Sequence, residues 1–422
     1  MMGGWSMLRL YIDPGTGSML FTILIGILGA AIYGIRTLFM KIRFYASSGR
    51  QEKNDNSRIP LAIFSDSKRY WNVFEPICDE LNKRGQKTVY YTASPDDPAL
   101  SKSYEHVTCE FIGEGNKAFA KLNMLRADLL LSSTPGLDVF QWKRSRDVKW
   151  YVHIPHAAND IVLYRMFGLD YYNAVLLSGD YQVRQIRQLE KLRNLPEKEL
   201  QIVGITYMDA MKKRKEMTPK LPEHPVTVLL APSWGESAIF SRYGGKIIEA
   251  LLKTGYHVIV RPHPQSFTSE KELIDGIMKQ YPQSEQLEWN SDNDNFEVLC
   301  RSDILISDFS GVIFDFALVY DKPVIYADTT MDTAPYDACW LNEELWTYSI
   351  LPQIGQHLDS NNLDRIKEVI DACLNDPRYE EGREIARSET WANIGHAADS
   401  VADYLISKLQ LLQNEGAKVK KQ

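Results

Sequence analysis

The polar side chains that follow apolar runs in the second half of the chain are the first candidates for chemistry. The run ILIS, residues 304–307, leads into DFSG, and an apolar segment with a single carboxylate, Asp315, comes next. A helix that starts after such a strand offers unpaired N–H groups to a phosphate, and a glycine there allows close approach. We therefore predict that Ser307, Ser310 and Gly311 bind phosphate oxygens. Asp315, about one turn further on, is predicted to bind a ribose diol.

Each of these positions also has a purely structural interpretation. The two serines would serve equally as helix caps, and Asp315 would then be an exposed helical residue. The apolar neighbours of Asp315 argue against full exposure. The loop PSWGES after the run VLLA is either a plain connection or part of the same nucleotide site, and it adds three candidates: Ser233, Trp234 and Gly235.

Two cationic side chains follow another apolar run, HVIV. Arg261 and His263 come directly after it, and each precedes a proline. Because prolines restrict the loop, the guanidinium and the imidazole are held in few orientations, which suits an anionic oxygen cluster such as a phosphate. A histidine that only caps the strand is the alternative.

The first half of the chain offers a candidate general base in WYVHIPHAAND. His153 and His156 follow an apolar run, with Asp160 soon after. An imidazole titrates near neutral pH, so either histidine would serve as a base, and a buried structural histidine is the alternative. The two histidines could also bind a metal ion together, but the sequence offers no third ligand at a suitable spacing. The segment NSDNDN around Asp292 and Asp294 is interpreted as helix capping, so no metal site and no cofactor is predicted.

Composition narrows the class of protein. The 422 residues are 44% hydrophobic and 24% charged, with a net charge of −7, which argues against a general nucleic-acid-binding protein. The five cysteines are scattered without a CxxC spacing, so we predict neither a zinc site nor a disulfide framework. A chain of this length favours two domains with accessory segments.

The amino-terminal segment has the composition of a membrane anchor. Residues 14–35 carry no charge, and about 20 apolar residues are enough to cross a bilayer as a helix. Four basic residues follow between positions 36 and 50, whereas Arg9 alone precedes the run, so we expect a single-pass protein of the cell membrane with its bulk in the cytoplasm. A cleaved signal peptide is the alternative. The glycines of the run would permit helix association, which leaves a homo-oligomer open.

Apolar runs and helical patterns alternate through the rest of the chain, which predicts parallel sheets covered by helices. The charged segment MKKRKEMTPKLPEHP separates two such α/β halves with a cleft between them. The predicted organisation begins with a membrane anchor (1–44), whose spanning helix lies at about 18–40, and a linker (45–58). A first Rossmann-like domain (59–212), an interdomain linker (213–225) and a second Rossmann-like domain (226–390) follow. A helix with a tail (391–422) comes last.

The motifs of the second half resemble a known family. RPHP at residues 261–264, followed by SDFSGVIFDFALVYDKPVIY, is similar to the CDP-glycerol glycerophosphotransferases, the teichoic-acid primase and polymerase group. The resemblance covers about residues 60–405 and is strongest over residues 226–330. It implies the GT-B fold, an α/β fold in which two Rossmann-like domains flank a cleft. This sequence departs from the usual family pattern at Gly311, where a second serine is usual, and at HIPHA, where Trp-His-Gly is usual.

The resemblance further implies a reaction and its participants. An acceptor hydroxyl attacks the β-phosphorus of CDP-glycerol, or of a related CDP-polyol, and CMP leaves. His263 and Arg261 would stabilise the diphosphate, Ser310 would hold phosphate oxygens, Asp315 would bind the ribose, and His156 would be the base. The acceptor would be a lipid-linked glycan at the cytoplasmic membrane face. A GT-B glycosyltransferase that uses a nucleotide sugar and a non-catalytic anchored scaffold are the alternative functions.

Overall fold

The computed structural model describes residues 31, 34, 58–219, 222–292, 294–329 and 331–419. The chain forms two compact units, Met1–Ser57 and Arg58–Gln422. The membrane helix predicted at 18–40 lies outside the described residues, except for positions 31 and 34. Among the residues that are described, none of the helices combines the length and the apolar composition needed to cross a membrane.

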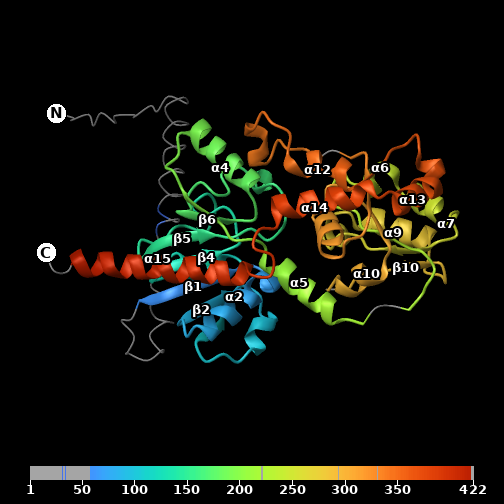
Figure 1. Cartoon of the computed structure of the whole chain (residues 1–422). Helices are drawn as coiled ribbons and strands as arrows, with labels where there is room; N and C mark the ends of the chain where they lie inside the picture. The colour runs from blue at the N-terminus through green and yellow to red at the C-terminus, as the bar shows by residue number, and fades with distance from the viewer. Residues whose placement is uncertain are drawn as a thin grey trace, which may run out of the picture. The chain divides into compact units, whose positions relative to one another are not determined.

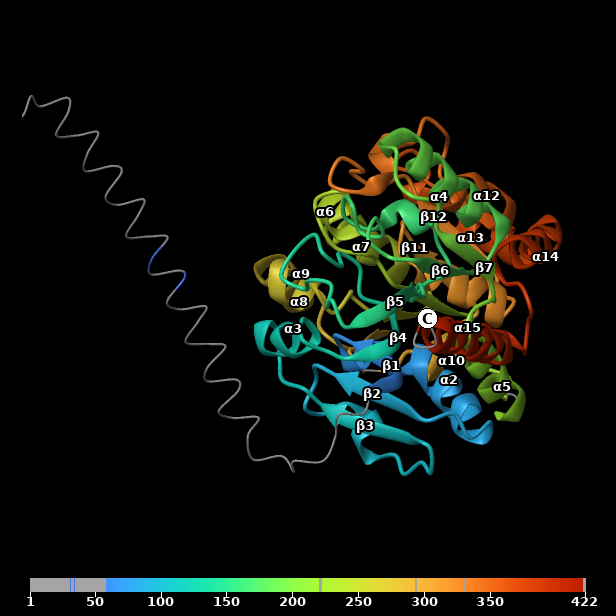
Figure 2. The same ribbon diagram turned by 90° about the vertical axis from the view of Figure 1, so that its left-hand side faces the viewer.

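Within residues 58–219, seven parallel strands form the first sheet, in the order β3-β2-β1-β4-β5-β6-β7. Figure 2 shows this order from one edge of the sheet to the other. Alternate residues of β1 point to opposite faces: Leu61 and Ile63 join one apolar core, and Ala62 and Phe64 join another. The strands are β1 Ile59–Ser65, β2 Thr88–Thr92, β3 Val107–Phe111, β4 Ala127–Ser132, β5 Val148–His153, β6 Ala174–Leu177 and β7 Glu199–Ile202.

In the described part of residues 222–419, six parallel strands form the second sheet, in the order β10-β9-β8-β11-β12-β13. Both sheets therefore share the doubly wound arrangement, in which the strands are first added on one side of the first strand and then on the other. The strand order switches between β1 and β4 in the first sheet and between β8 and β11 in the second. The strands are β8 Thr227–Leu230, β9 His257–Val260, β10 Leu287–Trp289, β11 Ile304–Ser307, β12 Val324–Ala327 and β13 Gly355–Leu358. The two Rossmann-like α/β domains predicted from the alternating pattern are thus present.

Helices connect the strands and cover the sheets (Figure 1). Helix α5 extends to Met217, into the segment predicted as the interdomain linker. The first half contains η1 Lys68–Tyr70, α2 Trp71–Lys83, η2 Pro98–Ser101, α3 Asn116–Leu122, η3 Ile161–Leu163, α4 Asp180–Arg193 and α5 Thr206–Met217. The second half contains α6 Ile239–Tyr243, α7 Lys246–Leu252, α8 Ser266–Ser269, α9 Lys271–Gln280, α10 Phe296–Arg301, α11 Val312–Phe314, the π-helix η4 Asp315–Val319, η5 Asp337–Trp340, α12 Trp346–Ile354, η6 Leu363–Arg365, α13 Ile366–Asn375, α14 Arg378–Thr390 and α15 Ala397–Val419.

One carboxylate of the first half caps a helix of the second half. The backbone N–H groups of Trp346 and Thr347, at the start of α12, donate to the two oxygens of buried Asp160, each at 2.8 Å. The Trp346 ring stacks on Tyr181 of α4, with ring centroids 4.6 Å apart, and packs against Phe314 of α11 at 5.0 Å. An N-terminal cap supplied from the other sheet domain ties the two α/β halves together.

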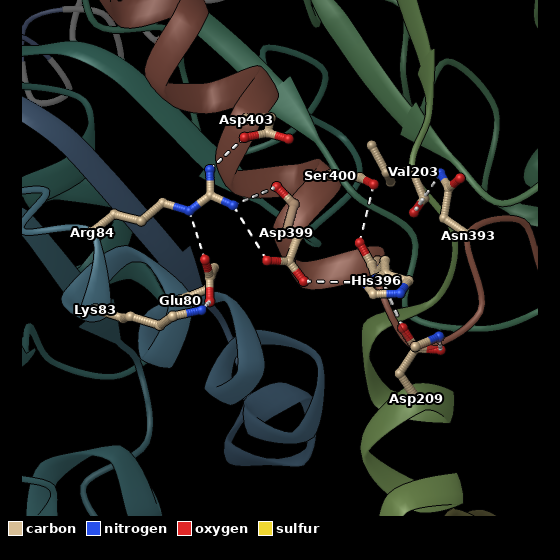
Figure 3. Close-up of polar contacts among 12 residues, drawn as sticks. Glu80, Lys83, Arg84, Val203, Asp209, Asn393, His396, Asp399, Ser400 and Asp403 are labelled. Atoms are coloured by element: carbon tan, nitrogen blue, oxygen red, sulfur yellow. Dashed lines mark hydrogen bonds and ion pairs between the residues drawn. The ribbon is translucent and has the colours of Figure 1, made fainter.

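Helix α15 returns from the second half to the first and packs against α2 (Figure 1). Its start is held by Asp209 of α5, which accepts from the backbone N–H groups of Gly395 and Ala397 at 2.8 and 2.9 Å. The indole of Trp391 donates to the same carboxylate at 2.8 Å. Figure 3 shows this junction beside a surface cluster in which Arg84 of α2 pairs with Asp399 of α15.

We expect Asp209→Ala to lower the free energy of unfolding by about 2 kcal/mol or more, because three donors at a half-buried junction lose their acceptor. Asp399→Ala is the matched control: it removes a carboxylate from the same turn of α15, but an exposed ion pair contributes about 0–1 kcal/mol. Urea unfolding followed by circular dichroism measures both variants. Equal losses in the two variants would contradict the capping role of Asp209.

Candidate functional site

The carboxyl ends of β8 and β11 are joined by one buried carboxylate. Asp308, directly after β11, accepts from the backbone N–H of Ser233 at 3.0 Å and of Ile239 at 3.1 Å. Burial raises the pKa of Asp308 to about 6, although these hydrogen bonds lower it. The hydroxyl of Ser307 donates to the carbonyl of Ala231 at 2.6 Å. The predicted phosphate ligand Ser307 therefore already has a backbone partner, and Asp308, which sequence reasoning missed, shapes the loop.

The loop after β8 presents an exposed tryptophan. Trp234 is 42% exposed, and its ring lies 6.4 Å from the ring of His263. Gly235 has φ +99°, a backbone conformation that is strained for any residue with a side chain. Its N–H donates to the carboxylate of Glu270 at 2.9 Å. This loop thus holds an aromatic ring beside the predicted phosphate-binding histidine.

His263 is held in one orientation and one tautomer. The backbone N–H of Gln265 donates to its Nδ1 at 3.1 Å, so a neutral ring carries its proton on Nε2. Burial lowers the pKa of His263, and the positive charge of Arg69 lowers it further, while Glu270 raises it. An uncharged imidazole with a fixed N–H donor is suited to a phosphate oxygen.

Arg261 lies after the same strand but has protein partners. Its guanidinium donates to the side chain of Asn290 and, at 2.7 Å, to the carbonyl of Asp292. Burial lowers its pKa. These bonds hold the loop after β10, where Asp294 accepts from the first N–H of α10, that of Phe296, at 3.0 Å. The catalytic role of Arg261 stays a prediction.

The motif helix, which consists of α11 and the π-helix η4, begins at Val312 directly after Ser310 and its N-cap residue Gly311. Gly311 has φ −59°, and a Cβ there would lie 3.8 Å from the Cβ of Ala157, so a serine would fit at this position. Asp315 is half-buried and accepts from the hydroxyl of Tyr207 at 3.0 Å. Burial raises the pKa of Asp315 to about 7, and the Tyr207 hydroxyl offsets only part of this. π-helical turns are frequent at functional sites, and this one carries the predicted ribose ligand.

The two histidines of the first half differ in environment. His153 is fully buried, and its Nε2 lies 3.1 Å from the hydroxyl of Tyr164. The His156 ring packs on Tyr70 at 4.5 Å and lies 5.9 Å from Tyr164. Burial lowers the pKa of His156 to about 4, so the imidazole is neutral at pH 7, although the same shift makes it a weaker base than a free imidazole. Because its loop also contains Ala157, His156 lies near the motif helix.

Further polar residues at the end of β1 escaped the sequence analysis. Asp66 follows β1, and burial raises its pKa while the Thr134 hydroxyl after β4 lowers it. Tyr70, one turn later, packs on His156. The only sequence signal for these residues is their place at the end of an apolar run. The described residues contain no group of three or more His, Cys, Asp or Glu placed to hold a metal ion.

A cavity of about 490 Å³ lies away from these groups, beside the carboxyl end of α5. Its lysines are already engaged: Lys215 donates to the carbonyls of Val319 and Tyr320, and Lys322 donates to carbonyls at the end of α10. We therefore place the candidate site at the carboxyl ends of the strands, where doubly wound sheets bind ligands.

Residues 170–340 match the family model described as CDP-Glycerol:Poly(glycerophosphate) glycerophosphotransferase. This segment is therefore similar to the CDP-glycerol glycerophosphotransferases. The resemblance expected from the SDFSG and RPHP motifs is confirmed over this segment, and the description of the matched family is that of a transferase. A stretch of 102 residues, 22% of this chain, is 33% identical to the minor teichoic acid biosynthesis protein GgaB of Bacillus subtilis (strain 168) and covers 10% of that protein.

Solved structures share the fold at low sequence identity. The S. aureus MnaA–UDP structure has a TM-score of 0.54 at 13% identity, covering 83% of this chain and 96% of that one. The structure of UDP-GlcNAc 2-epimerase from Neisseria meningitidis, bound to UDP-GlcNAc, has a TM-score of 0.52 at 13% identity. The match covers 82% of this chain and 99% of that one. These likenesses show the fold alone, the GT-B arrangement of two Rossmann-like domains.

We expect Asp315→Asn to gain stability relative to the natural protein as the pH rises. A folded-state pKa near 7, against an ordinary value near 3.8, means that the native state binds the proton more tightly than the unfolded chain. The ionised carboxyl therefore costs stability increasingly between about pH 4 and about pH 7, whereas the amide does not titrate. Urea unfolding of both proteins at about pH 4.5 and about pH 7.5 measures the difference.

Asp321→Asn is the control for this pH dependence, because Asp321 lies on the same segment. Burial raises the pKa of Asp321, but hydrogen bonds and charges from Arg383 and Arg387 outweigh this and lower it. Asp321 therefore titrates below about pH 4. The difference in unfolding free energy between Asp321→Asn and the natural protein should be the same at about pH 4.5 and about pH 7.5. A flat difference for Asp315→Asn as well would refute the raised pKa.

Proposed function

We propose that the protein transfers a glycerol-phosphate, or a similar polyol-phosphate, from a CDP-linked donor to a lipid-linked glycan or teichoic-acid-like acceptor and releases CMP. The observation that carries this proposal is the family match over residues 170–340, which includes the motif helix with Ser310 and Asp315. The fixed Nε2–H of His263 supports it, because such a donor suits a diphosphate oxygen.

In the proposed reaction, an acceptor hydroxyl attacks the β-phosphorus of the donor, and the bond between that phosphorus and the CMP oxygen breaks. His156 accepts the hydroxyl proton, which a neutral imidazole allows. His263 donates to an oxygen of the diphosphate and stabilises the charge that moves to CMP. Asp315 orients the nucleotide through its ribose, and Trp234 lies beside His263 with an exposed ring for the base.

Membrane attachment is part of the proposal. The uncharged residues 14–35, followed by basic residues, support a single-pass anchor with the catalytic unit on the cytoplasmic side. A lipid-linked acceptor would meet the enzyme at that surface.

A nucleotide-sugar glycosyltransferase is the second candidate, because solved structures of the same fold are complexes with UDP or UDP-GlcNAc. The two functions differ in the nucleotide released. An anchored scaffold without catalysis, the third candidate, predicts that substitutions of the proposed catalytic residues leave cellular function intact.

We expect the purified protein to release CMP from CDP-glycerol or a related CDP-polyol when it is incubated with a panel of CDP- and UDP-linked donors. His263→Gln should lower that rate about 100-fold or more, because one donor to the transition state is lost. His224→Gln, on the segment between the two sheets, should leave the rate unchanged. Chromatography of CMP, UMP and UDP measures the products. Release of UDP or UMP alone would replace the proposal with the second candidate.

A further inference from the structure

The turn after β1 is a rigid structure built by serine hydroxyls. Ser67 caps η1, and its side chain accepts from the backbone N–H of Arg69 at 3.3 Å. The hydroxyl of Ser65 donates to the carbonyl of Ser67 at 2.7 Å, and the N–H of Lys68 donates to the hydroxyl of Ser94 at 3.0 Å. The side chains of this turn therefore leave the backbone from fixed positions.

The three residues of η1 differ in what their side chains contact. Lys68 forms an ion pair with Asp96. The ring of Tyr70 packs on His156, with centroids 4.5 Å apart. The exposed guanidinium of Arg69, in contrast, has no ion-pair or hydrogen-bond partner among the described residues. A rigid turn thus presents one uncompensated positive charge next to the tyrosine that contacts the predicted base.

That charge lies close to the second domain. Arg69 precedes Tyr70, whose ring packs on His156, and Ala157 beside that histidine lies 3.8 Å from where a Cβ on Gly311 of the second domain would be. The positive charge of Arg69 also lowers the pKa of His263, after the larger effect of burial. The carboxylate of Glu270, which raises the pKa of His263, accepts from the N–H of Gly235 at 2.9 Å. The first domain therefore brings an unpaired guanidinium to the side on which the second domain carries Gly311 and the Nε2–H donor of His263. An anionic phosphoryl group between them would accept hydrogen bonds from both groups.

We propose that Arg69 binds the β-phosphoryl group of a nucleoside diphosphate donor and so completes, from the first domain, the phosphate site of the second. This inference rests on the proposed function for the identity of the donor. Arg69 and Tyr70 are neighbours, so the phosphoryl group bound by Arg69 lies between His263 and His156, on the path from donor to acceptor.

The guanidinium acts on charge only and keeps its protons. The acceptor oxygen forms its bond to the β-phosphorus as the bond from that phosphorus to the CMP oxygen breaks. The hydroxyl proton passes to His156, and the electron pair of the broken bond leaves with CMP. Arg69 stabilises the equatorial oxygens of the phosphoryl group during this exchange, as a fixed guanidinium can without a metal ion.

The test compares the dissociation constants of CMP, CDP and CDP-glycerol by isothermal titration calorimetry of the full-length protein. CMP lacks the β-phosphate, so Arg69→Gln should bind CMP within about twofold of the natural protein. The same variant should bind CDP and CDP-glycerol about 10- to 100-fold more weakly, the loss expected for a hydrogen bond between charged groups. Arg69→Lys should recover part of this affinity, because it restores the charge without the planar fork.

Lys68→Gln is the matched control. It removes one positive charge from the same turn, but that charge is paired with Asp96, so all three dissociation constants should stay within about twofold. Thermal melting of each variant establishes that the protein is folded. Unchanged CDP binding by folded Arg69→Gln overturns the inference, and so does an equal loss of CMP and CDP affinity, which would indicate a general disturbance of the site.

The outcomes also separate this inference from the proposed function. If the natural protein binds UDP but not CDP, the cytidine donor is wrong, and the same comparison is made with UMP and UDP. A selective loss of UDP binding in Arg69→Gln would then support Arg69 as the β-phosphate ligand while the donor assignment fails. A natural protein that binds none of these nucleotides overturns both proposals.

Discussion

The two hydrogen bonds from the start of α12 to Asp160 are the constraint on which the candidate site depends. They join a loop of the first domain to a helix of the second, and the Trp346 ring extends the junction to Phe314 on the motif helix. Because the loop that ends at Asp160 also carries His156, the same junction sets where the predicted base lies. The same loop carries Ala157, whose Cβ lies 3.8 Å from where a Cβ on Gly311 would be.

Burial moves the titrating groups of the site toward their uncharged forms. His156 and His263 have lowered pKa values, and Asp315 and Asp308 have raised ones. A site with neutral histidines and an exposed, unpaired Arg69 is suited to a ligand that brings its own negative charge.

Much of the fold was predictable, and the exceptions share a cause. The apolar runs at β1, β4, β8 and β11 indicate buried parallel strands because they are short and continuous. The sequence analysis did not find β3 or β13. These are edge strands with polar residues, VTCEF and GQHL, whose identity as strands depends on pairing with β2 and β12. Such pairing is a long-range property that local composition does not carry.

The sequence by itself determined which residues end each strand and hence which side chains, His263, Ser310 and Asp315 among them, occupy the binding edge of the second sheet. Strand alternation and the positions of prolines and glycines are local, so they can be inferred from neighbours along the chain. Only the tertiary structure decided the partners of these side chains: Arg261 donates to Asn290, Ser307 donates to the carbonyl of Ala231, and Tyr70 packs on His156. Those partners are brought together by the arrangement of the strands within each sheet, over separations in sequence that no local pattern spans.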